Sequence, residues 1–149
     1  MDAIPVKPRP PERDYSHRDV LDKLGTKPGL AVAVEEVTGP LDPAVADRLE
    51  ESLGRGLAAD DELVDLVLAA VDSTVNLAAV LAHWKERIDP KGGIWLLTPK
   101  RKFPGYVPDT ILIDAGRAAG LVDNKVCSVS DQTSAMRFVI RKVDRPKGA

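Results

Sequence analysis

The hydrophobic pattern of the chain begins with three short, nearly continuous apolar runs. They cover residues 30–34, 63–71 and 94–97. Runs of this kind are typical of strands that are covered on both faces, as in a parallel sheet. The segments between them have helical periodicity, so the pattern predicts consecutive βαβ units.

Four segments are predicted to be helical. The first begins near Ser16, with Gly25 after its end, and the second runs from about residue 43 to 53, after the capping residue Asp42. A third begins after Asn76 and is stopped by the sequence Pro-Lys-Gly-Gly at 90–93, and a fourth covers 108–119. Their apolar positions recur at helical spacing: Val20, Leu21 and Leu24; Val45, Leu49 and Leu53; Leu77, Val80, Leu81, Trp84 and Ile88.

The C-terminal part of the chain predicts two further strands, at residues 122–129 and 135–143. Only the polar turn at 130–134 joins them. Parallel neighbours need a longer crossover, so we expect the fifth strand to run antiparallel. Met136, Phe138 and Ile140 alternate with Arg137, Val139 and Arg141, which predicts one face more buried than the other.

Composition narrows the class of protein. The 149 residues are 44% hydrophobic, enough for one core, and 21 basic residues against 23 acidic ones give a net charge of -2. This balance argues against a dedicated nucleic-acid binder. No apolar run approaches the roughly 18 residues that span a bilayer. The first residues lack the apolar stretch of a signal peptide, and a single cysteine fits a reducing cytoplasm.

The chain is expected to form one domain at residues 15–143. It would be preceded by a flexible proline-rich arm at 1–14 and followed by a flexible tail at 144–149. Two histidines far apart and one cysteine give no metal-ligand spacing, so no metal site is expected.

Three stretches of this sequence resemble the bacterial domain of unknown function 3052. They are residues 15–29 (YSHRDVLDKLGTKPG), 92–100 (GGIWLLTPK) and 115–141, the last containing AAGLV at 118–122 and SDQTSA at 130–135. The resemblance covers most of residues 15–143. It implies a compact bacterial cytoplasmic protein and carries no established activity.

A looser resemblance is to class I methyltransferases. Lys27-Pro28-Gly29 before the first strand, IDPKGGIW at 88–95 and Ala119-Gly120-Leu121 before the two terminal strands are similar to parts of that fold. It implies a three-layer α/β, Rossmann-like open sheet of about five strands with helices on both faces. The strand order would be 1-2-3-5-4 with the last strand antiparallel, and two βα units after the first strand would be missing.

The loop after the first strand argues against the usual cofactor mode. A methyltransferase or dinucleotide site places several glycines there, so that the backbone can approach the ligand. Residues 34–40 (VEEVTGP) contain one glycine and then a proline, while Glu35 and Glu36 would repel a phosphate. The acidic residue that binds ribose in such enzymes follows a strand that is missing here. No cofactor is therefore expected.

The carboxyl ends of the strands remain the default ligand crevice. Residues 35–39, 72–76, 98–102 and the turn at 130–134 should gather there. A small anion could then be held by six side chains: Lys100, Arg101, Lys102, Asp131, Ser134 and Arg137. The alternative, which the pattern favours, is a solvated basic loop beside a polar hairpin.

Other candidates have simpler interpretations. His17 is more often a first-turn surface residue than a base, and His83 is expected to face solvent. Cys127 is expected to be an inert, partly buried thiol. Lys100 to Lys102 with Phe103 and Tyr106 could contact nucleic acid, but three charges in an acidic chain are a weak signal.

Two functions follow from these patterns. One is a non-catalytic binding or regulatory module that retains a Rossmann-like scaffold and could associate with a second copy or another protein through the edge of its first strand. The other is a group-transfer or nucleotide-linked enzyme with its site at residues 98–102 and 130–137. No catalytic residue can be named for it.

Overall fold

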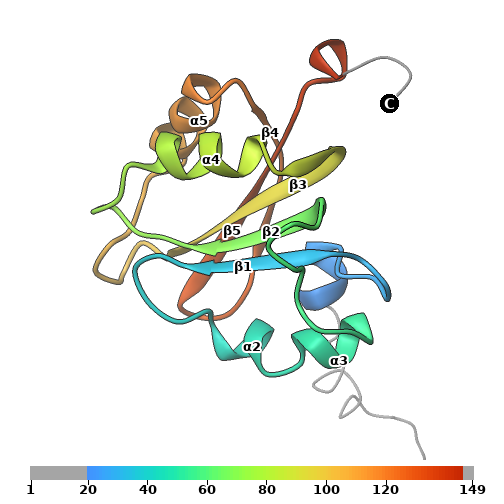
Figure 1. Cartoon of the computed structure of the whole chain (residues 1–149). Coiled ribbons are helices and arrows are strands. Elements are labelled where there is room, and N and C mark those ends of the chain that lie inside the picture. The colour runs from blue at the N-terminus through green and yellow to red at the C-terminus, as the bar shows by residue number, and fades with distance from the viewer. Residues whose placement is uncertain (1–19, 146–149) are drawn as a thin grey trace, which may run out of the picture.

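The computed structural model describes residues 20–145, which form a five-stranded sheet with helices on both faces (Figure 1). The strands are β1 (Val32–Glu36), β2 (Val64–Ala70), β3 (Ile88–Pro99), β4 (Val122–Ser128) and β5 (Thr133–Val139). Their order in the sheet is β1-β2-β3-β5-β4, which confirms the expected order. The expected N-terminal arm, the start of the first helix and His17 lie outside the described residues.

Strand direction follows from the length of the connections. β1, β2 and β3 are parallel neighbours, with Val32 opposite Leu66 and Ala69 opposite Leu96. β5 is antiparallel to both β3 and β4. This confirms the expectation for the last strand, because the turn between β4 and β5 is too short for a parallel crossover.

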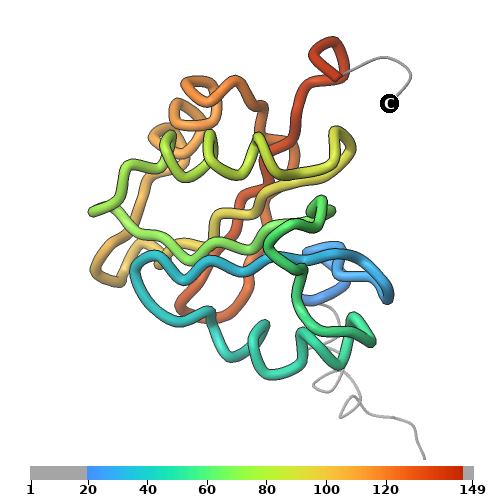
Figure 2. Tube along the Cα trace, viewed as in Figure 1, coloured from blue at the N-terminus to red at the C-terminus, as the bar shows by residue number. Residues whose placement is uncertain are grey.

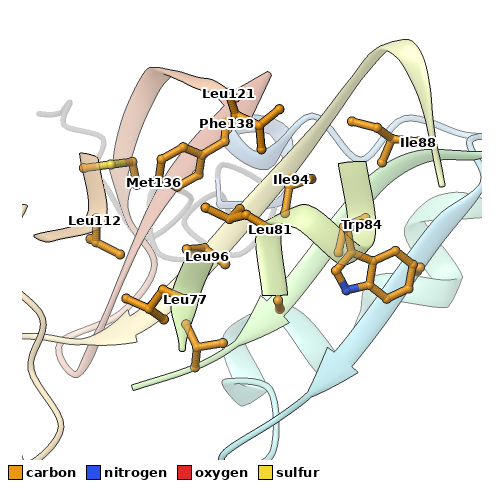
Figure 3. Packing of buried hydrophobic residues seen from close by; sticks show 14 of the residues in the cluster. Leu77, Leu81, Trp84, Ile88, Ile94, Leu96, Leu112, Leu121, Met136 and Phe138 are labelled. Atoms are coloured by element: carbon orange, nitrogen blue, oxygen red, sulfur yellow. The ribbon is translucent and has the colours of Figure 1, made fainter. Parts of the chain in front are cut away.

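Two helical layers cover the sheet (Figure 1). A helical turn at residues 20–24, α2 (Pro43–Ala46) and α3 (Leu49–Leu53) pack on one face around Trp95. On the other face lie α4 (Leu77–Lys85) and α5 (Asp109–Ala118), and Figure 3 shows buried side chains of the core on this face. Beyond the sheet, a 3₁₀ turn spans Lys142–Asp144.

Packing on the α4–α5 face depends on one close approach. Gly116 of α5 is buried, and a Cβ there would lie 2.6 Å from Cε2 of Phe138. Glycine in a helix interior costs about 1 kcal/mol relative to alanine. Here the missing side chain lets α5 pack directly on the ring of Phe138 in β5.

The helix expected at residues 43–53 is divided in two. Arg48, with φ -126 and ψ 6, interrupts it between α2 and α3. The apolar stripe still holds, because Val45, Leu49 and Leu53 are all buried against the same face. Gly54 ends α3 in the left-handed region, with φ 68, as its position after the stripe predicts.

The prediction that the third helix ends at residues 90–93 is wrong. α4 ends at Lys85, and Ile88 already belongs to β3, which is longer than the expected run at 94–97. The partner of β2 jumps from Ile88 opposite Val64 to Gly93 opposite Leu66, so the intervening residues form an irregularity within the strand. A Cβ at Gly92 would lie 2.7 Å from the carbonyl oxygen of Asp65, so only glycine passes this point undisturbed.

The sheet ends at β1 on one side and at β4 on the other. β1 is an edge strand, as expected, although it lies two residues later than the predicted run at 30–34. The backbone N–H of Ala58 donates to the carbonyl of Val32 at 2.8 Å and covers part of its edge. Addition of a second chain at this edge stays a prediction.

Candidate functional site

The carboxyl ends of β1, β2 and β3 meet at one edge of the sheet. Figure 2 shows the loops after these strands leaving the sheet on the same side. A cavity of about 200 Å³ lies there, lined by residues that include Thr38, Gly39, Asp72, Thr98 and Thr133. The four segments expected to gather therefore do meet.

The loop after β1 uses its own hydrogen-bond donors. The N–H groups of Val37 and Thr38 both donate to the carbonyl of Ala70, at 3.1 and 3.2 Å. The N–H of Leu41 donates to a carboxylate oxygen of Glu36 at 2.7 Å. Pro40 has no donor. Few backbone donors of this loop are thus left to bind a ligand, and the N–H of Leu41 already binds the carboxylate of Glu36.

Asp42 closes the same edge from the other side. Its Oδ1 accepts from the N–H of Ala44 at the start of α2, at 2.9 Å. Its Oδ2 accepts from the hydroxyls of Ser130 and Thr133, at 2.6 and 2.8 Å. Burial alone would raise the pKa of Asp42, but the hydrogen bonds from Ser130, Ala44 and Thr133 outweigh it and lower the pKa below its ordinary value of 3.8.

The cavity at this edge is small. Ligand pockets for small molecules usually enclose about 300–1,000 Å³, and the 200 Å³ cavity is smaller. The Asp42 cluster joins α2 to the β4–β5 turn across the crevice. Glu35 does not take part, because its carboxylate accepts the indole N–H of Trp84 at 2.6 Å on the α4 face. The expectation that no cofactor binds in the usual mode stays a prediction.

A larger cavity of about 500 Å³ lies beside that crevice, under the connection from β3 to α5. The connection is held at both ends. The N–H of Lys100 donates to the carbonyl of Gln132 at 2.8 Å, and the N–H of Ser73 donates to the carbonyl of Gly105 at 3.0 Å. Gly105 has φ 89 and lies so close to Asp72 that a Cβ would be 2.8 Å from the Asp72 Cβ. This loop therefore contacts the residues that follow β2 and the β4–β5 turn.

Five of the six expected ligand residues line the 500 Å³ cavity: Lys100, Arg101, Lys102, Asp131 and Ser134. Arg101 and Lys102 are exposed at its rim, and the Arg101 guanidinium lies 5.9 Å from the centroid of the Tyr106 ring. The Lys100 ammonium instead donates to the Ser128 hydroxyl at 2.6 Å. The three cations are thus not equivalent: one fastens the loop and two are available to a ligand.

Sequence reasoning missed the apolar part of this cavity. Val107, Leu112 and Met136 are buried and form its floor, while Phe103 is 37% exposed and Val126 lies on β4. Asp109 adds a second carboxylate beside Asp131. These residues come from separate elements, and helical or strand periodicity marks them only as core positions.

Arg137 does not belong to this cavity. It lies opposite Trp95 of β3 and lines a different cavity, together with Gly92 and Lys125. Gly92 and Thr98 lie toward opposite ends of β3, so the expectation that Arg137 joins Lys100 and Asp131 is wrong. Ser134, three residues earlier on β5, does line the expected cavity.

The remaining candidates behave as isolated groups. His83 is exposed on α4, with its ring 5.0 Å from that of Trp84 in an edge-on arrangement. Cys127 is partly buried on β4. Within residues 20–145, no group of three or more His, Cys, Asp or Glu side chains is placed to hold a metal ion. None of the helices in that part of the chain is long and apolar enough to cross a membrane.

Comparison with solved structures identifies the fold. The chain is similar to an S-adenosylmethionine-dependent methyltransferase from Aquifex aeolicus, with TM-score 0.53, 15% identity, and coverage of 91% of this chain and 100% of that one. It is also similar to the CcbJ methyltransferase of Streptomyces caelestis, with TM-score 0.54, 10% identity, and coverage of 85% and 89%. Human N-acetylserotonin methyltransferase gives TM-score 0.57 at 13% identity, over 84% of this chain and 51% of that one.

These structural similarities show a methyltransferase-like Rossmann fold. At such low sequence identity they show nothing about the reaction. No curated protein matches the sequence. A family model described as "Protein of unknown function (DUF3052)" matches residues 21–142. The chain therefore belongs to the DUF3052 family.

Proposed function

We propose that this chain is a non-catalytic binding module that holds a small amphipathic anion in the 500 Å³ cavity between the β3–α5 loop and β5. The observation that carries the proposal is the size of that cavity beside the smaller one at the same edge of the sheet. The cavity at the carboxyl ends of β1 and β2 encloses about 200 Å³, whereas the cavity next to it encloses about 500 Å³ and is within the usual size for small ligands.

The lining of the cavity supports a ligand with two parts. The floor, formed by Val107, Leu112 and Met136, would cover an apolar ring or acyl group. The exposed Arg101 and Lys102 would bind an anionic group at the rim.

The charge of the lining indicates a single negative charge on the ligand. Three cations face two carboxylates, Asp109 and Asp131, around the cavity. A highly charged anion would meet repulsion from the carboxylates, so we expect a monoanion with an apolar body. We place this activity in the cytoplasm, as the single cysteine favours.

Titration with 8-anilinonaphthalene-1-sulfonate, an aromatic monoanion, tests the proposal. The native protein is expected to bind it saturably at one site. Replacing Arg101 and Lys102 together by glutamine should weaken binding about tenfold, because the rim charges are lost. Replacing Phe103 by alanine should also weaken binding. Fluorescence titration measures the affinity, and circular dichroism verifies that each variant is folded.

A matched control removes two charges elsewhere. Arg117 on α5 and Lys142 are exposed and do not line the cavity, so their double glutamine variant should bind like the native protein. Equal affinity of the Arg101/Lys102 variant would overturn the proposal. A rise in melting temperature with S-adenosylmethionine would instead support a group-transfer enzyme.

A further inference from the structure

The side chain of Arg137 is a partly buried cation that no carboxylate of residues 20–145 pairs with. Its Nε is buried and finds no hydrogen-bond partner among residues 20–145. No ion pair joins the guanidinium to a carboxylate in that part of the chain. Burial lowers the pKa of Arg137, because desolvation disfavours the charged form. A desolvated cation of this kind is unfavourable unless something pairs with it.

The sheet makes room for this side chain at a glycine. The Arg137 guanidinium crosses over Gly93 of β3, and a Cβ at Gly93 would lie 3.1 Å from both Cζ and Nη2, with Nε closer still. Any side chain at residue 93 would therefore displace the guanidinium. Because Gly93 lies on the amino-terminal side of Trp95, the arginine is directed away from the edge that carries the 500 Å³ cavity.

A separate cavity of about 450 Å³ lies where the arginine is directed. Four lysines from separate segments line it with Arg137: Lys23, Lys27, Lys91 and Lys125.

Three carboxylates also line this cavity, and two of them accept backbone hydrogen bonds. Asp65 accepts from the N–H of Ala31 at 3.0 Å, and Asp89 accepts from the N–H of Lys91 at 2.9 Å. With Asp22, three described carboxylates face Arg137, Lys27, Lys91 and Lys125, while Lys23 already has an interaction of its own. The cavity therefore combines several cations with a guanidinium that pairs with no carboxylate in the described part of the chain.

We propose that this cavity binds a small phosphorylated molecule, with Arg137 as the residue that contacts the phosphate group. A guanidinium matches the spacing of two phosphate oxygens, and ammonium groups around it add attraction without fixed geometry. The bound anion would supply the counter-ion that the described chain does not provide.

Calorimetric titration of the full chain with inorganic pyrophosphate, at constant ionic strength, tests this site. The native protein is expected to bind one equivalent, and Arg137→Met to lose at least tenfold in affinity. Lys125→Gln, at an exposed position of edge strand β4, should weaken binding severalfold without affecting folding. The Arg101/Lys102 glutamine variant serves as the control and should bind pyrophosphate normally, so the two cavities are tested independently.

Stability without ligand provides a second readout. Methionine has an unbranched side chain as long as the Cβ–Nε stem of arginine and carries no charge, so Arg137→Met should unfold at the same temperature as the native protein or at a higher one. The proposal would be overturned if the native protein did not bind pyrophosphate, or if Arg137→Met and Lys125→Gln bound it as tightly as the native protein does. Equally tight binding of citrate would overturn the assignment to phosphate.

Discussion

Replacing Trp95 by alanine is expected to lower the free energy of unfolding by about 3–5 kcal/mol, the usual cost of truncating a buried tryptophan. Trp95 is 1% exposed at the centre of the face that carries α2 and α3. Its indole N–H donates to the carbonyl of Leu24 at 2.8 Å and so joins the helical turn at 20–24 to β3. The variant loses both the packing and this hydrogen bond.

Urea denaturation followed by circular dichroism measures the effect. Trp95→Phe is the matched control: it retains most of the ring and loses the donor, so it should cost only about 1–2 kcal/mol. A loss below about 1 kcal/mol for Trp95→Ala would contradict the central position of this side chain.

Asp42→Ala is expected to reduce stability by about 2–3 kcal/mol. The variant removes the cap of α2, worth about 1 kcal/mol, and leaves the hydroxyls of Ser130 and Thr133 without their charged acceptor. Replacing Ser130 and Thr133 together by alanine retains the cap and should cost less. Urea denaturation of these two variants and of the variant that combines them completes a double-mutant cycle. Additive losses of stability would show that the contact across the crevice contributes nothing.

The same carboxylate predicts a dependence on pH. The pKa of Asp42 is lower in the folded protein than its ordinary value of 3.8, so the folded state binds its proton less readily than the unfolded state. Its contribution to stability is therefore fully present above the unfolded pKa and is lost as pH falls through the folded pKa.

Between about pH 5 and pH 3, the native protein should lose more stability than Asp42→Asn. Hydrogen bonds from Thr74 also lower the pKa of Asp72, but that residue is present in both proteins, so the difference between the two curves isolates Asp42. Parallel curves would show that Asp42 does not contribute.

The candidate site was only partly predictable. Lys100, Arg101 and Lys102 follow a buried strand, and the general position of ligand crevices at carboxyl ends was sufficient to place them with Asp131 and Ser134. Arg137 was misplaced, because the strand pattern predicts the face of a side chain and not the direction in which a long side chain extends. That direction depends on Gly93, which precedes it by 44 residues in the chain and lies beneath it in the sheet.

The sequence by itself determined which segments form strands and helices and the antiparallel direction of β5, although not the interruption at Arg48 or the boundary between α4 and β3. These features are local, since apolar periodicity sets the buried face of each element and the length of a connection limits how two strands can pair. The tertiary structure alone decided the contacts between distant segments: the Asp42 cluster, the 500 Å³ cavity beside it, and Arg137, which lies over Gly93 and pairs with no carboxylate of residues 20–145. Each depends on side chains that become neighbours only when the sheet is assembled, and no periodicity along the chain records that proximity.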